Sequence, residues 1–174
     1  VGRETLRAAM GATQDRADLV ALPGDDAALI SVGGARQVMT TDHLRAMTAD
    51  PVVMTRIAAV HALGDIWAMG ARPQASTATL ILPRQTEALQ ARMLSEIMET
   101  ARTVMRAAGA EIVGGHTSQG DELTIGFTIT GLCEGDPVTL AGGCAGDVLI
   151  LTKPIGSGVL MAAEMQGRAK GAWV

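Results

Sequence analysis

Two short apolar runs joined by a pair of glycines constrain this chain most strongly, because they fix how its first strands are connected. Residues 27–32 and 37–41 form the two runs, and Gly33 and Gly34 lie between them. A glycine pair at this place favours a tight β-hairpin, in which the two strands run antiparallel. A doubly wound parallel sheet requires strict alternation of strand and helix, so the hairpin argues against that fold.

The rest of the chain contains patterns that are typical of helices and of further strands. Apolar residues recur at helical spacing over residues 51–69 and 86–108. Asp50 is suited to capping the first of these helices, and Gly70 and Gly109 are suited to ending the two. We also expect a helix over residues 3–10, strands over 75–82, 111–113, 123–132 and 148–152, and a helix from about Gly158. This order predicts an α+β fold in which helices cover one face of a mixed or antiparallel sheet.

Composition and charge argue against several classes of partner. The net charge of −4 is dispersed, and the chain has no Tyr, one Phe and two Trp, so a basic stripe and an aromatic ladder for nucleic acid are both missing. Charged residues, Gly or Pro interrupt every apolar run before it reaches membrane-spanning length. Cys133 and Cys144 are too few for a zinc site or a disulfide framework. We therefore expect a cytoplasmic protein that binds neither nucleic acid nor membrane.

Four aspartates stand at the ends of apolar elements. They are Asp25 and Asp26 in PGDDAAL, Asp42 in MTTDHL and Asp65 in HALGDIWAMG. Carboxylates beside buried elements are costly to desolvate unless something compensates their charge. Magnesium is a natural compensator, because it takes oxygen ligands and is typically shared between one or two carboxylates and substrate phosphates. The pattern therefore indicates a site for magnesium and phosphate.

Structural explanations of the same residues remain open. Asp65 could pair with Arg56 or Arg72, or cap a neighbouring turn. Asp25 and Asp26 could belong to an ordinary Pro-Gly-Asp turn. The sequence alone does not choose between these roles and metal binding.

A glycine-rich stretch, GGHTSQGDE at residues 114–122, follows a short predicted strand. Consecutive glycines let backbone N–H groups approach a phosphate, and Thr117 and Ser118 add hydroxyl donors. His116 could also donate to a phosphate. The stretch has neither the Gly-Lys-Ser/Thr signature of a Walker loop nor a dinucleotide fingerprint. A generic strand-to-loop turn with a surface histidine is the alternative, and Lys153 is either an anion contact or a solvated strand-end lysine.

The order of the motifs resembles the amino-terminal domain of selenide, water dikinases over residues 23–161. The motifs are PGDDAAL, TTDHL, DPVVMTRIAAVHALGDIWAMGARP, AGAEIVGGHTS, ITGL and AGDVLILTKPIGSGVL. The wider superfamily includes aminoimidazole ribonucleotide synthetase, thiamine-monophosphate kinase and a hydrogenase maturation protein. Thiamine-monophosphate kinases share similar aspartate motifs but usually carry Asp where this chain has His116.

The resemblance implies a four-stranded sheet that pairs with the sheet of a second copy into a barrel-like dimer core. It implies that ATP lies in a cleft, with its phosphates held through magnesium ions that Asp26 and Asp65 bind. The positions that it implies for ATP binding are Pro23, Gly24, Asp25, Asp42, Asp65, Gly115, His116 and Thr117, the last three in a loop that reaches ATP across the dimer. The implied reaction converts ATP, selenide and water into selenophosphate, AMP and phosphate.

The chain also departs from the pattern of selenide, water dikinases. Nothing before Pro23 resembles their glycine-rich segment with a reactive Cys or selenocysteine and a Lys, so no catalytic residue is assigned. His61 stands where these enzymes usually have Asn, and Gly64 where Ser is common. Local contacts to the nucleotide are therefore expected to differ.

The expected domain organisation is one ATP-binding domain over residues 1–154, followed at 155–174 by the start of a truncated carboxy-terminal domain or a linker helix. Val1 is not an initiator Met, which suggests a piece of a longer polypeptide that is inactive by itself. The alternatives are another kinase or synthetase of the superfamily, such as thiamine-monophosphate kinase with a different small acceptor, and a dimerisation domain whose site has decayed.

Overall fold

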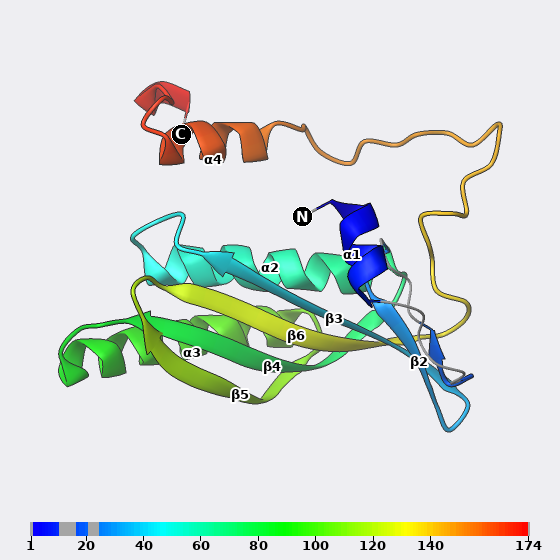
Figure 1. Cartoon of the computed structure of the whole chain (residues 1–174), viewed down its shortest axis with the longest axis horizontal. Coiled ribbons are helices and arrows are strands. Elements are labelled where there is room, and N and C mark those ends of the chain that lie inside the picture. Colours follow the sequence, from blue (N-terminus) through cyan, green and yellow to red (C-terminus); the bar gives the residue numbers. More distant parts are fainter. Residues whose placement is uncertain (1, 11–16, 21–24, 174) are drawn as a thin grey trace. The chain divides into compact units, whose positions relative to one another are not determined.

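In the computed structural model of the chain, which describes residues 2–10, 17–20 and 25–173, six strands form one mixed sheet in the order β1-β2-β3-β6-β4-β5 (Figure 1). The strands are β1 (Leu19–Val20), β2 (Ala28–Val32), β3 (Ala35–Arg45), β4 (Arg72–Pro83), β5 (Glu111–Gly120) and β6 (Thr124–Cys133). Neighbouring strands are antiparallel except for β4 and β5, which are parallel. The predicted α+β class with a mixed sheet is thus confirmed.

The sheet has more strands than the four that the family resemblance implied. The 11-residue strand β3 pairs with β6 along one edge, which leaves its other edge for a further strand. The hairpin through Gly33 and Gly34 places β2 on that edge, and β1 then pairs with β2. Both glycines have positive φ, +56° and +86°. A two-residue turn of this kind requires φ above zero at both positions, so the predicted hairpin is confirmed.

The helices begin and end close to the predicted positions. They are α1 (Arg3–Met10), α2 (Pro51–Ala68), α3 (Glu87–Ala107), α4 (Ser157–Met165) and a short 3-10 helix, η1 (Gly171–Trp173). Asp50 caps α2, since its side-chain Oδ1 accepts hydrogen bonds from the backbone N–H groups of Val52 and Val53 at 2.8 and 3.1 Å. Gly70 and Gly109 follow α2 and α3 with φ of +69° and +87°, the left-handed conformation that commonly ends a helix.

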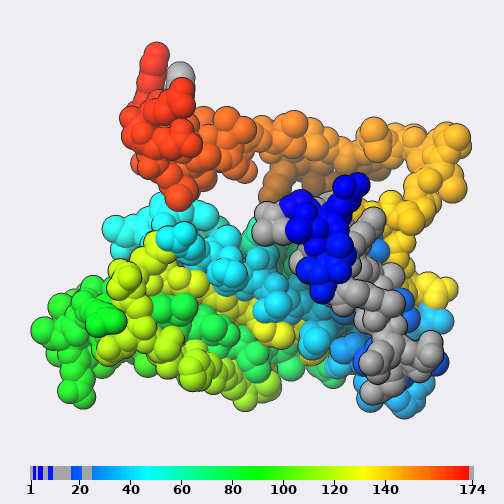
Figure 2. Space-filling view, viewed as in Figure 1, coloured from blue at the N-terminus to red at the C-terminus, as the bar shows by residue number. Residues whose placement is uncertain are grey.

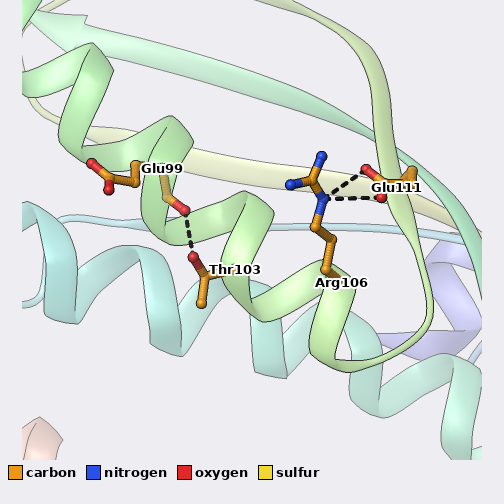
Figure 3. Close-up of polar contacts among 4 residues, drawn as sticks. All are labelled: Glu99, Thr103, Arg106 and Glu111. Atoms are coloured by element: carbon orange, nitrogen blue, oxygen red, sulfur yellow. Dashed lines mark hydrogen bonds and ion pairs between the residues drawn. The ribbon is translucent and has the colours of Figure 1, made fainter.

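One polar contact lies within the end of α3, and another ties that end to the strand that follows it. Thr103 Oγ1 donates to the carbonyl oxygen of Glu99 at 2.9 Å, and Arg106 Nε lies 2.9 and 3.2 Å from the two carboxylate oxygens of Glu111 (Figure 3). Glu111 is the first residue of β5. A parallel pair of strands needs a crossover connection, and α3 provides it between β4 and β5.

The hydrophobic core lies between the sheet and the two long helices. Alternate residues of β4 and β6, such as Leu80, Ile125 and Phe127, are fully buried and pack with α2 and α3, which contact each other. The residues between them, such as Thr79, lie on the other face, which these helices do not cover. In the space-filling view, the atoms from β2 to β6 pack into one continuous body (Figure 2). The alternation of buried and more exposed residues along β4 confirms the expectation that the helices cover one face of the sheet.

The glycine-rich stretch after residue 113 is a strand, not the predicted loop. The strand β5 continues to Gly120 and pairs with β4 from Ala75 opposite Glu111 to Pro83 opposite Gly120. Pairing along a whole neighbouring strand outweighs the low strand preference of glycine. Gly115 also fits the close approach of the two strands, because a Cβ atom at this position would overlap the carbonyl oxygen of Ala78.

The chain divides into two compact units, Val1–Ala141 and Gly142–Val174. The second unit contains α4, but the strand predicted over residues 148–152 is not formed. Leu149 is 99% exposed, and no described strand pairs with this segment. An apolar run becomes a strand only where another strand supplies hydrogen-bond partners. Among the described residues, no helix is both long and apolar enough to cross a bilayer.

Candidate functional site

Asp65 lies on α2 beside strand β3, and its closest polar partner is a hydroxyl group. Thr40 Oγ1 donates to Asp65 Oδ2 at 2.6 Å, and Thr40 is only 8% exposed. The ion pair that the sequence left open with Arg72 is not formed, because Arg72 lies 3.2 Å from Glu134 instead. Arg56, the other candidate, is exposed. Asp65 is therefore a partly buried carboxylate without an arginine partner among these two candidates.

Asp42 lies two residues further along β3, on the same face of the strand as Thr40. Its Oδ2 is 2.9 Å from Nε2 of His61, which stands on α2. Its Oδ1 accepts a hydrogen bond from the backbone N–H of His43, also at 2.9 Å. Both carboxylate oxygens of Asp42 are thus held.

The pKa of Asp65 depends on its burial and on the charges of two further aspartates. Burial raises the pKa of the Asp65 carboxyl above its ordinary value, and the negative charges of Asp42 and Asp26 raise it further. The hydrogen bond from Thr40 and the nearby His61 act in the opposite direction. Asp26, Asp42 and Asp65 come from three separate segments of the sequence, so it is the fold that brings the charges of Asp26 and Asp42 within electrostatic range of Asp65.

The remaining predicted residues lie elsewhere or outside the described residues. Asp25 Oδ1 accepts a hydrogen bond from the backbone N–H of Leu140 at 2.9 Å, so it helps to fix the segment that follows β6. Pro23 and Gly24 lie outside the residues that the structure describes. Their predicted contacts with ATP stay predictions.

Gly115, His116 and Thr117 are exposed residues of β5, the strand at one edge of the sheet. Strands β6 and β4 separate β5 from β3, which corresponds to roughly 14 Å at ordinary strand spacing. His116 pairs with Thr79, which places it on the face away from the helices, whereas Asp42 lies on the helix-covered face. Within one copy of the chain, the structure does not bring these three residues to the aspartates.

The donor set suits a cation that is shared with a ligand. Among residues 2–10, 17–20 and 25–173, no three His, Cys, Asp or Glu side chains are placed to hold a metal ion by themselves. Magnesium usually keeps several waters and takes only one or two carboxylates together with substrate phosphates. The effect of Asp26 and Asp42 on Asp65 fits that mode of binding, because each nearby carboxylate makes Asp65 costlier to ionise without a cation.

Two residues of this site, Thr40 and His61, were not assigned to it by the sequence analysis. The available signal was spacing: Thr40 and Asp42 are two apart in a strand, and His61 and Asp65 are four apart in a helix. Each spacing places two side chains on one face of its element. Which face of the strand meets which face of the helix depends on tertiary packing.

Replacing Thr40 by Val is expected to destabilise the protein by about 1–3 kcal/mol, since it leaves a partly buried carboxylate without its hydroxyl donor. The pKa of Asp65 should rise further, because the hydrogen bond from Thr40 now lowers it. Urea unfolding measures the first effect and an NMR titration of Asp65 the second. The control is Thr41→Val on the opposite face, whose exposed hydroxyl accepts from Thr128. Equal losses in the two variants would contradict the role assigned to Thr40.

Comparison with known proteins adds a family and several relatives. Residues 24–133 match the family model described as AIR synthase related protein, N-terminal domain. A selenide, water dikinase of Nitratidesulfovibrio vulgaris strain DP4 is 37% identical over 145 residues, which make up 82% of this chain and 41% of that protein. The chain therefore spans less than half the length of this curated relative.

Solved structures show the same fold. The protein tt0281 from Thermus thermophilus matches with a TM-score of 0.66 and 25% identity over 79% of this chain and 45% of that one. PurL of Thermotoga maritima, solved in complex with ATP, matches with a TM-score of 0.54 and 22% identity over 66% of this chain and 21% of that one. The second likeness is one of fold alone.

Proposed function

Because this chain belongs to the AIR synthase related family through that family's N-terminal domain, we propose that it is the ATP- and magnesium-binding part of a selenophosphate synthetase-like enzyme. The similarity to selenide, water dikinase supports the choice within the family. The proposed reaction of the whole enzyme converts ATP, selenide and water into selenophosphate, AMP and phosphate. Selenide, or another small acceptor, would be the second substrate.

The observation that carries the proposal is the position of Asp42 and Asp65 between β3 and α2, where the charge of Asp26 also acts on Asp65. Phosphoryl transfer depends mainly on positioning and on neutralising charge along the phosphate chain. Magnesium bound by Asp26 and Asp65 would supply that neutralisation. Asp25 and Asp42 would contact the nucleotide or its metals, and Pro23 and Gly24 would form the turn on the phosphate side.

A second copy of the chain is part of the proposal. Gly115, His116 and Thr117 lie too far from the aspartates to share a ligand within one copy, so they would reach ATP from the other protomer of a homodimer. The sheet face that α2 and α3 do not cover is available for this pairing, and it is lined by threonines such as Thr41 and Thr79. Two such faces would form the barrel-like core of the dimer.

The test is isothermal titration calorimetry of the protein with AMPPCP, a non-hydrolysable ATP analogue, in magnesium and then in EDTA. We expect binding heat that requires magnesium, because the carboxylates repel the phosphate chain without a cation between them. Heat of equal size in EDTA would contradict the shared-metal site. Absence of heat under both conditions would favour a domain that only dimerises.

A further inference from the structure

We infer that His61 is a positioning residue of the proposed nucleotide site, where its imidazole fixes the orientation of the Asp42 carboxylate. The inference rests on the proposed function. It deepens that function by assigning a role to a side chain that is not itself proposed to contact ATP or magnesium. Three observations support it: the contact between the two side chains, the spacing of the residues on α2 and β3, and the exposure of His61.

The contact between the two side chains is direct. His61 Nε2 lies 2.9 Å from Asp42 Oδ2, within the range of a charge-assisted hydrogen bond. The backbone N–H of His43 donates to the other oxygen. The carboxylate therefore has one contact at each oxygen, one with α2 and one with its own strand, which limits its rotation. An imidazole can donate from Nε2 when it is neutral and when it is protonated, so the contact does not require a particular charge.

The contact is one of two parallel links between α2 and β3. His61 and Asp65 are four residues apart on the helix, a rise of about 6 Å. Thr40 and Asp42 are two residues apart on the strand, a rise of about 6.7 Å. Since these distances nearly match, His61 meets Asp42 at one level while Asp65 meets Thr40 at the next. The second link holds Asp65 and the first holds Asp42, so each aspartate has its own polar support.

The exposure of His61 separates this role from a structural one. Its side chain is 56% exposed, so it adds little to the hydrophobic core. Removing it is expected to leave folding stability nearly unchanged, because exposed single contacts of this kind contribute little. An effect on ligand affinity without an effect on stability would thus be specific to positioning.

The experiment compares four variants of the protein by calorimetry with AMPPCP and magnesium, and by thermal unfolding. His61→Ala should weaken binding about tenfold, the lower end of the effect of groups that orient a metal ligand. His61→Gln should restore most of the affinity, because its amide nitrogen is three bonds from Cβ, as Nε2 is. His61→Asn should restore less of the affinity than His61→Gln, because its nitrogen is two bonds from Cβ. Val60→Ala, at an exposed neighbouring position on α2, is the matched control and should bind like the unsubstituted protein.

The outcomes are distinguishable. Weakened binding in His61→Ala, with an unchanged melting temperature and recovery in His61→Gln, supports the inference. Binding equal to that of the unsubstituted protein in His61→Ala overturns it and leaves the proposed function intact. A lowered melting temperature in His61→Ala, without recovery of affinity in His61→Gln, also overturns it in favour of a structural role. If the unsubstituted protein does not bind AMPPCP with magnesium, the proposed function fails and this inference fails with it.

Discussion

Replacing Asp65 by Asn is expected to weaken magnesium-dependent binding of AMPPCP by more than about 100-fold, since groups that merely orient a metal ligand are already worth about 10–100-fold. The amide is nearly the same size as the carboxylate and keeps an oxygen that can accept from Thr40. The variant should therefore fold like the parent protein and lose only the charge that would bind the cation.

The same substitution is expected to weaken magnesium-dependent binding without lowering the stability of the metal-free protein. The pKa of Asp65 is raised in the folded state, so the folded protein holds this proton more tightly than the unfolded chain does. Stability from this residue is present at pH values below its ordinary pKa and is lost as the pH rises through the raised pKa. The Asn variant removes that loss, so it should be equal to or more stable than the parent at neutral pH without magnesium.

Calorimetry and thermal unfolding in EDTA measure both effects. Asp121→Asn is the control, because it makes the same chemical change at an exposed position between β5 and β6. Unfolding of the Asp65 variant would show that the carboxylate is structural. Undiminished magnesium-dependent binding would remove Asp65 from the site.

Replacing Phe127 by Ala is expected to cost about 3–5 kcal/mol of folding stability, the range for deleting a buried aromatic side chain. Phe127 is 1% exposed and is the single phenylalanine of the chain. In the sheet it pairs with Asp42 on one side and Ala78 on the other, so it lies directly beside the strand that carries the site. The cavity would thus weaken the support under Asp42 as well as the core.

Urea unfolding followed by circular dichroism gives the loss for this variant. The matched variant is Phe127→Leu, which keeps most of the apolar volume and should cost less than about 1.5 kcal/mol. Losses of similar size in the two variants would mean that the core collapses around the smaller side chain. A loss below about 1 kcal/mol in Phe127→Ala would contradict the packing described for β6.

Local signals in the sequence were sufficient to predict the hairpin and the two long helices. Gly33 and Gly34 can take positive φ at no steric cost, and the Asp50 cap acts on residues only two and three positions away. The segments at residues 114–120 and 148–152 were predicted wrongly for a common reason. A strand forms where a partner edge is available, and the residues of a segment do not report whether that edge exists.

The aspartates of the candidate site could be singled out from the sequence, but the residues that contact them could not. The aspartates were singled out because a carboxylate on an apolar element needs compensation, and Asp42 and Asp26 both raise the pKa of Asp65. Thr40 and His61 are common residue types in common positions, and they acquire a role only because α2 packs against β3 in one particular register. Packing of this kind joins residues 25 and 19 positions apart, and no local pattern contains it.

The tight approach of β5 to β4 limits what selection experiments on this strand can reveal. In a library randomised at position 115, glycine would be recovered even under selection for folding alone, because a Cβ atom at this position would overlap the main chain of Ala78. His116 and Thr117 carry no such restriction and are exposed. Selection for particular residues at positions 116 and 117 would therefore indicate a phosphate contact, whereas selection for glycine at position 115 would not.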